Sequence, residues 1–578
     1  MAVVTPPAIV ILGPGALATA RRVQALYAGA RVHALQGRVQ GDVAFSELGA
    51  HLRECYARGA PIVALCAAGI VIRCLAPLLA NKGAEPPVLA LAEDGSAVVP
   101  LLGGLTGVNV MAREIGAALA VAPAITTSGE LRFGTCLLNP PAGYALASLA
   151  QGKRFVSDLL AGASTRVAGN APWLENVDLP RDGDARHAIR VSAQAWDGNP
   201  AVLVIHPRSI VAAVGAPREA IAERVRRALA AHGLAPLALA ALVAPSSHMR
   251  DASLAQAATE LGVPLRFVDG ADPTPQAVLC ALDLGADIER YTSNEDGIAL
   301  ACAAAPLDPH TLGRARGKLT VLGLGPGRAD LLAPAARAAL DDATDIVGYA
   351  TYVDMAGPFR ADQQRHATDN REELQRARHA FEMASEGRRV AVVSSGDPGV
   401  FAMAAAVLEA LEGSDDARWH AVALTIVPGV SAALATAAQA GAPLGHDFCM
   451  LSLSDNLKPW SVIEQRLLHA AQADLVMAFY NPISRARPWQ LDRALEIVRS
   501  ERAPQTRVVL GRDVGRPGGT LRAMTLGELR SADVDMRTMV IVGSSTTRGF
   551  ARGDGGEWIY TPRWYRDDVQ FKREAGGE

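Results

Sequence analysis

The sequence predicts a multidomain α/β protein, and three observations support this fold class. Short apolar runs of strand length alternate with amphipathic helical patterns along most of the 578 residues, which is typical of α/β architecture. A chain of this length exceeds what one hydrophobic core usually organises, so we expect several domains. The segment 304–318 is rich in Pro, Gly and basic residues, and the alternation restarts after it, so we expect a linker there.

The composition narrows the class of function. Half of the residues are hydrophobic, 20% are charged and the net charge is -3, so we expect a folded protein that binds no nucleic acid. The seven cysteines are scattered and form no CxxC pair. This pattern predicts neither a metal site nor a disulfide framework, and it favours a reducing, cytoplasmic location. No basic region precedes the N-terminal apolar run, and no apolar run is long enough to cross a bilayer, so we expect neither a signal peptide nor a membrane span.

The first half of the chain is predicted to contain three parts. Residues 1–130 form an α/β domain, the pattern weakens and turn residues multiply in 131–205, and 206–303 form a small α/β domain. Asp94 and Gly95 lie between two apolar runs and predict a hairpin. The expected strands are 9–12, 31–35, 62–66, 88–92, 97–102, 210–214, 239–243 and 264–268, and the expected helices are 16–27, 70–80, 217–232 and one that ends near 119.

The second half is predicted as one further α/β domain, 319–565, followed by a charged tail, 566–578. An apolar helical pattern begins at Val400, directly after the turn 394–399. Pro459 and Pro488 suit the first turns of helices. The expected strands are 319–322, 390–394, 425–427, 448–453, 475–479, 507–510 and 539–542, with a helix at 331–340.

Two glycine-rich turns follow predicted strands. The run GPGALA at 13–18 fits the dinucleotide fingerprint G-x-G-x-x-A. The next strand ends without an acidic residue for a ribose, and Arg38 follows where it would meet a 2′-phosphate. An NADP-dependent oxidoreductase is therefore one alternative. The run GLGPGR at 323–328 has Arg328 at the third fingerprint position and lacks the Gly-Lys-Ser/Thr of a P-loop, so it fits neither motif.

Four turns after predicted strands share small side chains and exposed backbone donors. They are 323–327, 395–399, 428–432 and 480–482. Ligands of α/β folds bind at the carboxyl ends of strands, and glycine lets a ligand approach the backbone closely. Together the four turns predict a pocket for a flat, polar ligand.

Several segments of the second half carry a family resemblance. They include LTVLGLGPGRADLL, VVSSGDPGVFAM, GHDFCMLSLSDNLKPW and FYNPISRARPWQ. Over 319–565 the chain resembles the tetrapyrrole methyltransferase family, which implies a two-lobed α/β fold with S-adenosylmethionine bound between the lobes. The combination of GHDFC, SLSDxLxPW and YNPxSxxRPWQ resembles the branch that methylates C17 of precorrin-3B, or of its cobalt counterpart, and contracts the ring to give precorrin-4. The resemblance also implies a homodimer and a small-molecule tetrapyrrole substrate.

The resemblance implies roles for individual residues. A sulfonium methyl group is already activated, so the protein must mainly position donor and acceptor. His446 and Asp455 are the candidate acid–base residues for ring contraction, and Asp397 either contacts the ligand or caps the helix behind it. The implied cofactor contacts are Pro326, Ser395, Gly396, Asp397, Val400, Ser431, Ala432, Asn481 and Asp513. The candidate partners of the substrate carboxylates are Lys458, Arg485, Arg487, Arg512 and Arg516.

Segments of the first half point to a second family of the same pathway. They include IVALCAAGIVIRCLAPLLANK, AEDGSAVVPLLGGLTGVNVMAREIGAAL, PAITTS and VPLRFVDG. Over about 5–290 the chain resembles cobalt-precorrin-5A hydrolase, an enzyme of cobalamin biosynthesis. It departs from that family at Leu105, where a His is typical, and at 214–218, where a Gly-Cys-Arg-rich turn is typical. The resemblance implies either an active hydrolase or a degenerate module, and a non-catalytic corrinoid-binding protein is the other alternative for the chain.

Overall fold

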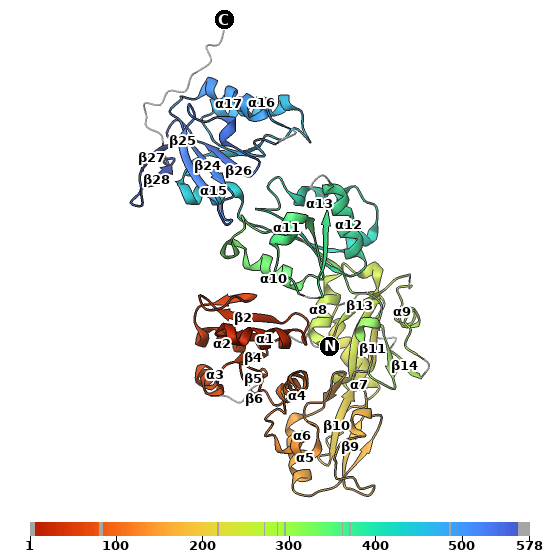
Figure 1. The fold of residues 1–578 in the computed structure, drawn as a ribbon. Coiled ribbons are helices and arrows are strands. Elements are labelled where there is room, and N and C mark those ends of the chain that lie inside the picture. The colour runs from red at the N-terminus through yellow and green to blue at the C-terminus, as the bar shows by residue number, and fades with distance from the viewer. Residues whose placement is uncertain are drawn as a thin grey trace. The chain divides into compact units, whose positions relative to one another are not determined.

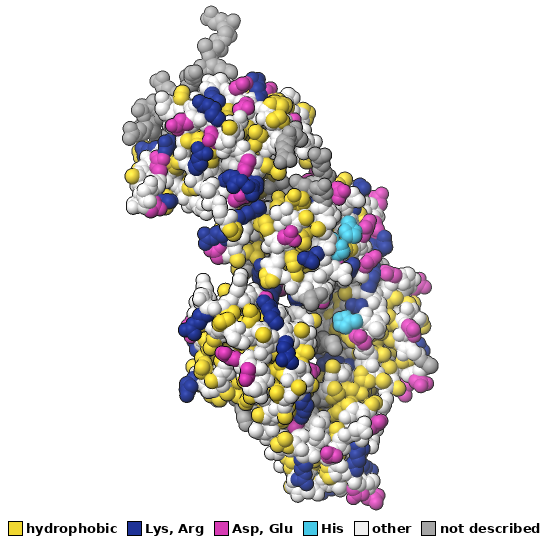
Figure 2. Space-filling model, viewed as in Figure 1, with side chains coloured by type: hydrophobic (Ala, Val, Ile, Leu, Met, Phe, Trp, Pro, Cys, Tyr) yellow, Lys and Arg dark blue, Asp and Glu magenta, His cyan; other side chains and the backbone are white. Residues whose placement is uncertain are grey.

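The computed structural model describes residues 6–79, 85–216, 219–270, 272–285, 287–293, 296–360, 362–368, 372–484 and 487–564. The chain divides into two compact units, Met1–Gly317 with Pro358–Asp362, and Lys318–Gly357 with Gln363–Glu578 (Figure 1). Arg485 and the predicted tail lie outside the described residues. In the described part of the chain, no helix has the length and apolar character needed to span a membrane. Basic and acidic side chains are interspersed on the face shown in Figure 2.

The first sheet of the N-terminal unit has the order β3-β2-β1-β4-β5-β6. β6 pairs antiparallel with β5, which confirms the predicted hairpin, and the other strands run parallel. α1 and α4 cover one face with Val23 and Ile115, and α2 and α3 cover the other with Leu52 and Val71. The elements are β1 Ala8–Ile11, α1 Leu17–Gln24, β2 Arg31–Leu35, β3 Val43–Phe45, α2 Leu48–Ala57, β4 Ile62–Leu65, α3 Ala68–Leu75, β5 Val88–Leu91, β6 Val98–Leu102 and α4 Val108–Leu119.

Two further sheets complete the N-terminal unit. The four-stranded sheet β7-β10-β9-β8 forms in the region of weak pattern, around a core that contains Phe133 and Phe155. The five-stranded sheet β13-β12-β11-β15-β14 includes the hairpin β14–β15, which the sequence analysis did not predict. The elements are α5 Ser128–Phe133, β7 Tyr144–Leu146, α6 Leu149–Leu160, β8 Thr165–Ala168, β9 His187–Val191, β10 Val202–Pro207, β11 Ile210–Val214, α7 Ile221–Ala231, β12 Leu239–Pro245, α8 Ala252–Leu261, β13 Leu265–Val268, α9 Pro275–Cys280, β14 Ile288–Ser293 and β15 Ile298–Ala303.

Part of the segment predicted as a linker is held against β13. The guanidinium of Arg266 donates to the carbonyl oxygens of His310 (3.0 Å), Leu312 (3.0 Å) and Gly313 (2.7 Å). Phe267 and Arg314 exchange two backbone hydrogen bonds of 2.8 and 2.9 Å. A buried guanidinium needs such acceptors, so residues 310–314 are folded onto the sheet.

The first lobe of the C-terminal unit contains an all-parallel sheet, β18-β17-β19-β16-β20. α12 and α13 cover one face with Phe381 and Val407. Because the strands are parallel, their carboxyl ends share one edge of the sheet. The elements are β16 Lys318–Gly323, α10 Pro334–Asp342, β17 Asp345–Tyr349, α11 Ala350–Met355, β18 Gln364–Thr368, α12 Glu373–Ser385, β19 Arg389–Ser394, α13 Met403–Glu412, α14 Ala417–Ala421 and β20 Ala423–Val427.

The second lobe contains the sheet β22-β23-β26-β24-β25. β26 is antiparallel to both β23 and β24, and β22 is parallel to β23, so the carboxyl ends of β22, β23 and β24 share one edge. α16 and α17 cover one face, and α15 covers the other. The elements are α15 Ala432–Ala440, β21 Gly441–Ala442, β22 Phe448–Ser452, α16 Trp460–Gln472, β23 Val476–Tyr480, α17 Gln490–Glu501, β24 Arg507–Arg512, β25 Thr520–Thr525, β26 Thr538–Val542, β27 Arg548–Ala551 and β28 Glu557–Tyr560.

The helix expected from Val400 begins three residues later, at Met403. The side chain of Asp397 accepts a hydrogen bond from the Gly399 N–H (2.8 Å), which makes a tight turn. Phe401 then adopts the left-handed conformation, with φ 53°. The apolar pattern is therefore interrupted by a loop that the local turn chemistry imposes.

Asp474 joins three elements of the second lobe through its buried carboxylate. The Ser545 N–H and hydroxyl donate to it at 2.9 and 2.6 Å, and it forms an ion pair with Arg502 at the end of α17. Asp474 is 9% and Arg502 6% exposed. A buried ion pair therefore links the end of α17 to the loops before β23 and after β26.

We expect Asp474→Asn to lower the free energy of unfolding of this lobe by about 3–5 kcal/mol, because the Arg502 charge then lies buried without this counterion. Asn preserves the left-handed backbone of Asp474, at φ 57°, which Ala would strain. Urea unfolding followed by tryptophan fluorescence measures the change. Asp342→Asn is the control, since it breaks only exposed pairs, with Lys318 (3.0 Å) and Arg389 (3.2 Å), and should cost less than about 1 kcal/mol. Equal losses in the two variants would contradict the expectation.

Candidate active site

Three loops meet at the carboxyl edge of the first-lobe sheet. Gly325 and Gly396 exchange backbone hydrogen bonds of 3.1 and 2.8 Å. The Gly429 N–H donates to Asp397 Oδ2 (3.0 Å), while Gly399 occupies Oδ1. Asp397 therefore ties the loop after β19 to the loop after β20, and it does not cap α13. The carboxylate is only partly buried, so lone pairs remain for a ligand.

Two glycines allow these loops to come together. A Cβ on Gly323 would lie 2.3 Å from the carbonyl oxygen of Gly396, and a Cβ on Gly429 would lie 2.2 Å from the same oxygen. Real Cβ atoms do not approach an oxygen so closely, so any other residue at either position would push the loops apart.

Three residues around this edge have a left-handed backbone without being glycine. They are Phe401 (φ 53°), Asn481 (φ 50°) and Asp513 (φ 49°). Asn and Asp tolerate this conformation, but a bulky Phe does so rarely. Phe401 is half exposed, and its ring lies 5.2 Å from that of Tyr480 at the end of β23. Strained residues of this kind cluster at ligand-binding sites.

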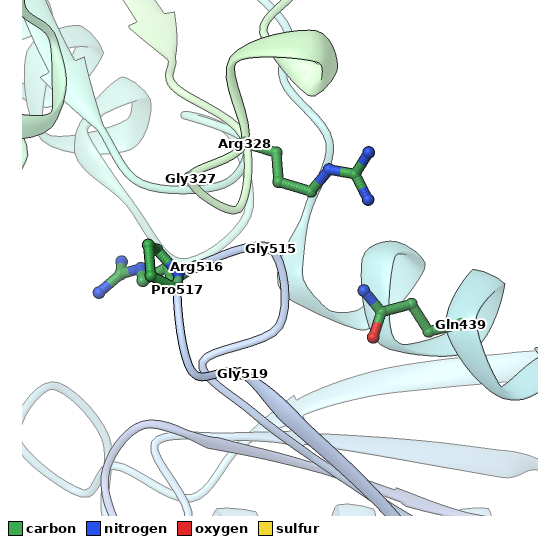
Figure 3. Close-up of a pocket in the computed structure, with 7 residues that line it drawn as sticks. All are labelled: Gly327, Arg328, Gln439, Gly515, Arg516, Pro517 and Gly519. Carbon is green, nitrogen blue, oxygen red and sulfur yellow. The ribbon is translucent and has the colours of Figure 1, made fainter. Parts of the chain in front are cut away.

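A cavity of about 400 Å³ lies between the loop 327–328 of the first lobe and the loop 515–519 of the second (Figure 3). Figure 3 shows the Arg328 and Gln439 side chains on one side of the loop 515–519 and the Arg516 guanidinium extending from the other. Arg516 donates to the Pro326 carbonyl oxygen (3.4 Å) and to the Ser395 hydroxyl (3.3 Å). The residues that line the cavity are Gly327, Arg328, Gln439, Gly515, Arg516, Pro517 and Gly519.

Most of the remaining cofactor candidates lie around the same edge. Ser431 caps α15, its hydroxyl accepting from the Leu434 N–H (3.4 Å), and Ala432 opens that helix. Asn481 donates to the Ser452 hydroxyl (3.1 Å). Val400 lies in the bend before α13, partly buried. These residues lie in loops that follow β19, β20 and β23, or at the start of the helix after such a loop.

Asp513 and Arg512 are engaged with other charges. Asp513 Oδ2 lies 3.3 Å from Arg512 and 3.2 Å from Arg537, and Arg512 Nε donates to Asp535 (2.8 Å). Their side chains therefore hold the end of β24 in place, which leaves Arg512 less available to a substrate than Arg516.

The structure does not bring His446 and Asp455 together. His446 precedes β22 and Asp455 follows it, and a five-residue strand separates its ends by roughly 16 Å. His446 Nδ1 accepts from the Asp447 N–H (2.7 Å). Asp455 accepts from Gln490 Nε2 (3.2 Å) and lies at the carboxyl edge, beside the ends of β22 and β23.

Two of the residues predicted to bind substrate carboxylates, Lys458 and Arg487, lie in loops that follow β22 and β23. Arg487 donates to the carbonyl oxygen of Asn481 (3.3 Å). Lys458 lies in the loop after Asp455, where burial and then the nearby Arg466 lower the pKa of its ammonium group. Arg485 lies outside the described residues.

Gln439 was not found from the sequence. It occupies one position in an alanine-rich helix, and nothing in its neighbours marks it as a ligand contact. The glycines of the loop 515–519 carried a usable signal, since the run VGRPGG at 514–519 begins four residues after the end of the predicted strand 507–510.

The N-terminal glycine turn has an unfavourable charge beside it. A cavity of about 460 Å³ lies at the carboxyl ends of β1, β4 and β5, and no Lys or Arg is among the described residues that line it. A Cβ on Gly15 would lie 3.3 Å from Glu93 Oε2, so a carboxylate faces the turn where a pyrophosphate would approach. Arg38 is exposed. The geometry does not favour the NADP-dependent alternative. The lining residues are Leu12, Cys66, Ala67, Ala68, Ile70, Ala90, Leu91, Ala92, Glu93, Ala97 and Val99.

Two family models match separate segments of the chain. Residues 318–530 match the model of the tetrapyrrole (corrin/porphyrin) methylases, and residues 50–130 match the cobalamin synthesis G N-terminal domain. Precorrin-3B C(17)-methyltransferase of Sinorhizobium sp is 51% identical over 249 residues, which are 43% of this chain and 97% of that protein.

A fused relative and a solved structure are also similar in sequence to part of this chain. Cobalamin biosynthesis protein CobIJ of Mycobacterium tuberculosis is 47% identical over 253 residues, which are 43% of this chain and 48% of that protein, so the chain spans about half of its length. The crystal structure of the methyltransferase CobJ has 53% sequence identity, covers 43% of this chain and 100% of its own, and has a TM-score of 0.40. The chain belongs, through its C-terminal half, to the tetrapyrrole (corrin/porphyrin) methylases, and it carries a cobalamin synthesis G N-terminal domain ahead of that half.

Proposed function

We propose that the C-terminal half transfers a methyl group from S-adenosylmethionine to C17 of precorrin-3B, or of its cobalt counterpart, with contraction of the ring to precorrin-4 in cobalamin biosynthesis. The observation that carries the proposal is that glycine-rich loops at the carboxyl ends of the first-lobe strands lie beside the guanidinium groups of Arg328 and Arg516. The name of the Sinorhizobium relative, to which the chain is 51% identical, supports the same reaction.

The loops around Asp397 suit the cofactor. S-adenosylmethionine, when bound, supplies an activated methyl group on its sulfonium. The close contact of Gly323, Gly396 and Gly429 leaves an edge of bare backbone, which a zwitterionic ligand can approach. The partly buried carboxylate of Asp397 and the hydroxyl of Ser395 offer it acceptors. The residues of the chain then serve to hold the donor in line with the acceptor atom.

The arginines of the two lobes suit a polycarboxylate acceptor. Arg328 of the first lobe, whose guanidinium also pairs with Asp330, and Gln439 of the second lobe line the cavity together. Arg516 of the second lobe reaches Ser395. Guanidinium groups bind carboxylates through two parallel hydrogen bonds. Lys458 and Arg487 extend this basic edge. We therefore propose that the substrate carboxylates lie along it.

Asp455 is our proposed proton-transfer residue for ring contraction. It follows β22 and lies at the carboxyl edge of the second-lobe sheet, whereas His446 precedes β22 and lies at the opposite end of that strand. A general acid or base must come within hydrogen-bond reach of the reacting atom, which favours Asp455 over His446.

The N-terminal half is proposed as a hydrolase-like module that binds a corrinoid intermediate. The match to the cobalamin synthesis G N-terminal domain over 50–130 supports this reading. The cavity of about 460 Å³ beside Glu93 is its candidate ligand pocket. A cytoplasmic location and a homodimer complete the proposal, on the scattered cysteines and on the resemblance of the C-terminal half.

The first expectation concerns Gly429. In Gly429→Ala the added Cβ meets the Gly396 carbonyl oxygen, so the loops must separate, and the dissociation constant for S-adenosylmethionine should rise by about tenfold or more. Isothermal titration calorimetry on the full chain measures it, with thermal unfolding to show that the variant is folded. Gly553→Ala is the matched control, because nothing lies within 4 Å of the added Cβ. An unchanged affinity in Gly429→Ala would argue against cofactor binding at these loops.

The second expectation concerns Arg328. In Arg328→Gln the cavity loses a charge-assisted partner for a substrate carboxylate, so kcat/KM for precorrin-3B should fall by about 10–100-fold. The affinity for S-adenosylmethionine should stay the same. Anaerobic assays with product masses read by mass spectrometry measure the rate. Arg493→Gln on α17, whose guanidinium pairs with Glu464 (2.7 Å), is the control and should have wild-type kinetics. Wild-type kcat/KM in Arg328→Gln would remove this residue from the substrate site.

A further inference from the structure

Two histidines and a cysteine converge between β2 and α2 of the N-terminal unit. His33 Nδ1 lies 2.8 Å from His51 Nε2, and Cys55 Sγ lies 3.8 Å from the same nitrogen. One ligand atom from each residue lies within 4.8 Å of the other two. His51 and Cys55 are four residues apart on one face of α2, and His33 meets them from β2, whose neighbouring residues Val32 and Ala34 enter the opposite core.

The cluster is held in place by its surroundings. Cys55 is 1% and His51 9% exposed. The ring of Phe45 on β3 stacks on His51 with centroids 4.6 Å apart and planes at 2°. Buried rings with fixed neighbours keep their nitrogen atoms in one direction, which is what a preorganised ligand set requires.

The ring nitrogens of the two histidines point at each other. His33 Nδ1 and His51 Nε2 share one hydrogen bond, so both nitrogens face the space between β2 and α2. An imidazole binds a metal ion through the lone pair of such a ring nitrogen.

We propose that His33, His51 and Cys55 form a binding site for a divalent transition-metal ion of the zinc and cobalt type. Metal–nitrogen bonds of about 2.0–2.1 Å and metal–sulfur bonds of about 2.3 Å place tetrahedral ligand atoms roughly 3.4–3.6 Å apart. The separations of 2.8 and 3.8 Å in the cluster lie on either side of these values, so small side-chain rotations suffice. Three protein ligands leave a fourth position for water.

A cation borders the cluster. Arg58 Nη2 lies 3.8 Å from Cys55 Sγ. Arg58 also pairs with Glu54 (3.3 Å), so its charge is partly offset. This inference does not depend on the proposed methyl transfer, because all three ligands belong to the N-terminal unit.

The test is a titration of the metal-stripped, full-length protein with Co²⁺. We expect one equivalent to bind with a thiolate-to-cobalt charge-transfer band and the strong visible bands of a tetrahedral site, and Zn²⁺ should remove both. Cys55→Ser should lose the charge-transfer band and bind at least tenfold more weakly. Cys280→Ser, at an exposed cysteine of the same unit, is the matched control and should keep the band. Zn²⁺ should raise the thermal unfolding midpoint of the wild type and of Cys280→Ser, but not of Cys55→Ser.

A second variant guards against a folding defect. His33→Gln alters the most exposed of the three ligands and should also abolish the tetrahedral spectrum while its circular dichroism stays that of the wild type. The absence of stoichiometric Co²⁺ binding, or a charge-transfer band that survives in Cys55→Ser, would overturn the proposal. In that case the two rings form only a buried hydrogen bond.

Discussion

The hydrogen bond from the Gly429 N–H to the Asp397 carboxylate is the constraint on which the candidate active site depends. β19 and β20 are not neighbours, since β16 lies between them in the sheet. A bond between their loops must therefore cross the loop that follows β16. This crossing places the Gly396 carbonyl oxygen where a side chain on Gly323 or Gly429 would stand. The charge-assisted bond and the two glycines are consequently one structural device.

The two lobes contribute different chemistry to the cleft. The first lobe offers backbone and small side chains, with Arg328 as its one cation in the cavity lining described here, while the second offers Arg516 and Gln439. Arg516 also donates to Pro326 and Ser395 of the first lobe. A substrate carboxylate that engages Arg516 would thus compete with bonds that hold the lobes together, so binding of the acceptor and the geometry of the cofactor loops are coupled.

The sequence predicted the α/β class, most strands and the turns that follow several of them, because strand-end turns with Gly, Ser and Asp are local signals. The contact between Asp397 and Gly429, 32 residues apart, is a tertiary bond that no local pattern contains. The role of Gln439 also depends on tertiary packing and was not predicted. The group of His33, His51 and Cys55 was not predicted either, because the fold of α2 beside β2 brings these three residues together. The sequence predicted that α13 begins at Val400 rather than at Met403, because the apolar pattern continues through the loop whose turn Asp397 stabilises.

In the N-terminal unit, the side chain of Glu93 opposes a function that the strand order would allow, the binding of a dinucleotide. Its central strand order, with β1 beside β4 and β2 beside β3, is the arrangement on which dinucleotides bind in other proteins. Glu93 nevertheless faces the glycine turn, 3.3 Å from the position of a Cβ on Gly15. Two like charges about 4 Å apart near a protein surface repel by about 4 kcal/mol. A pyrophosphate at this turn would meet that repulsion with no basic side chain in the described lining to offset it, so the topology permits a dinucleotide site and the charge at residue 93 opposes it.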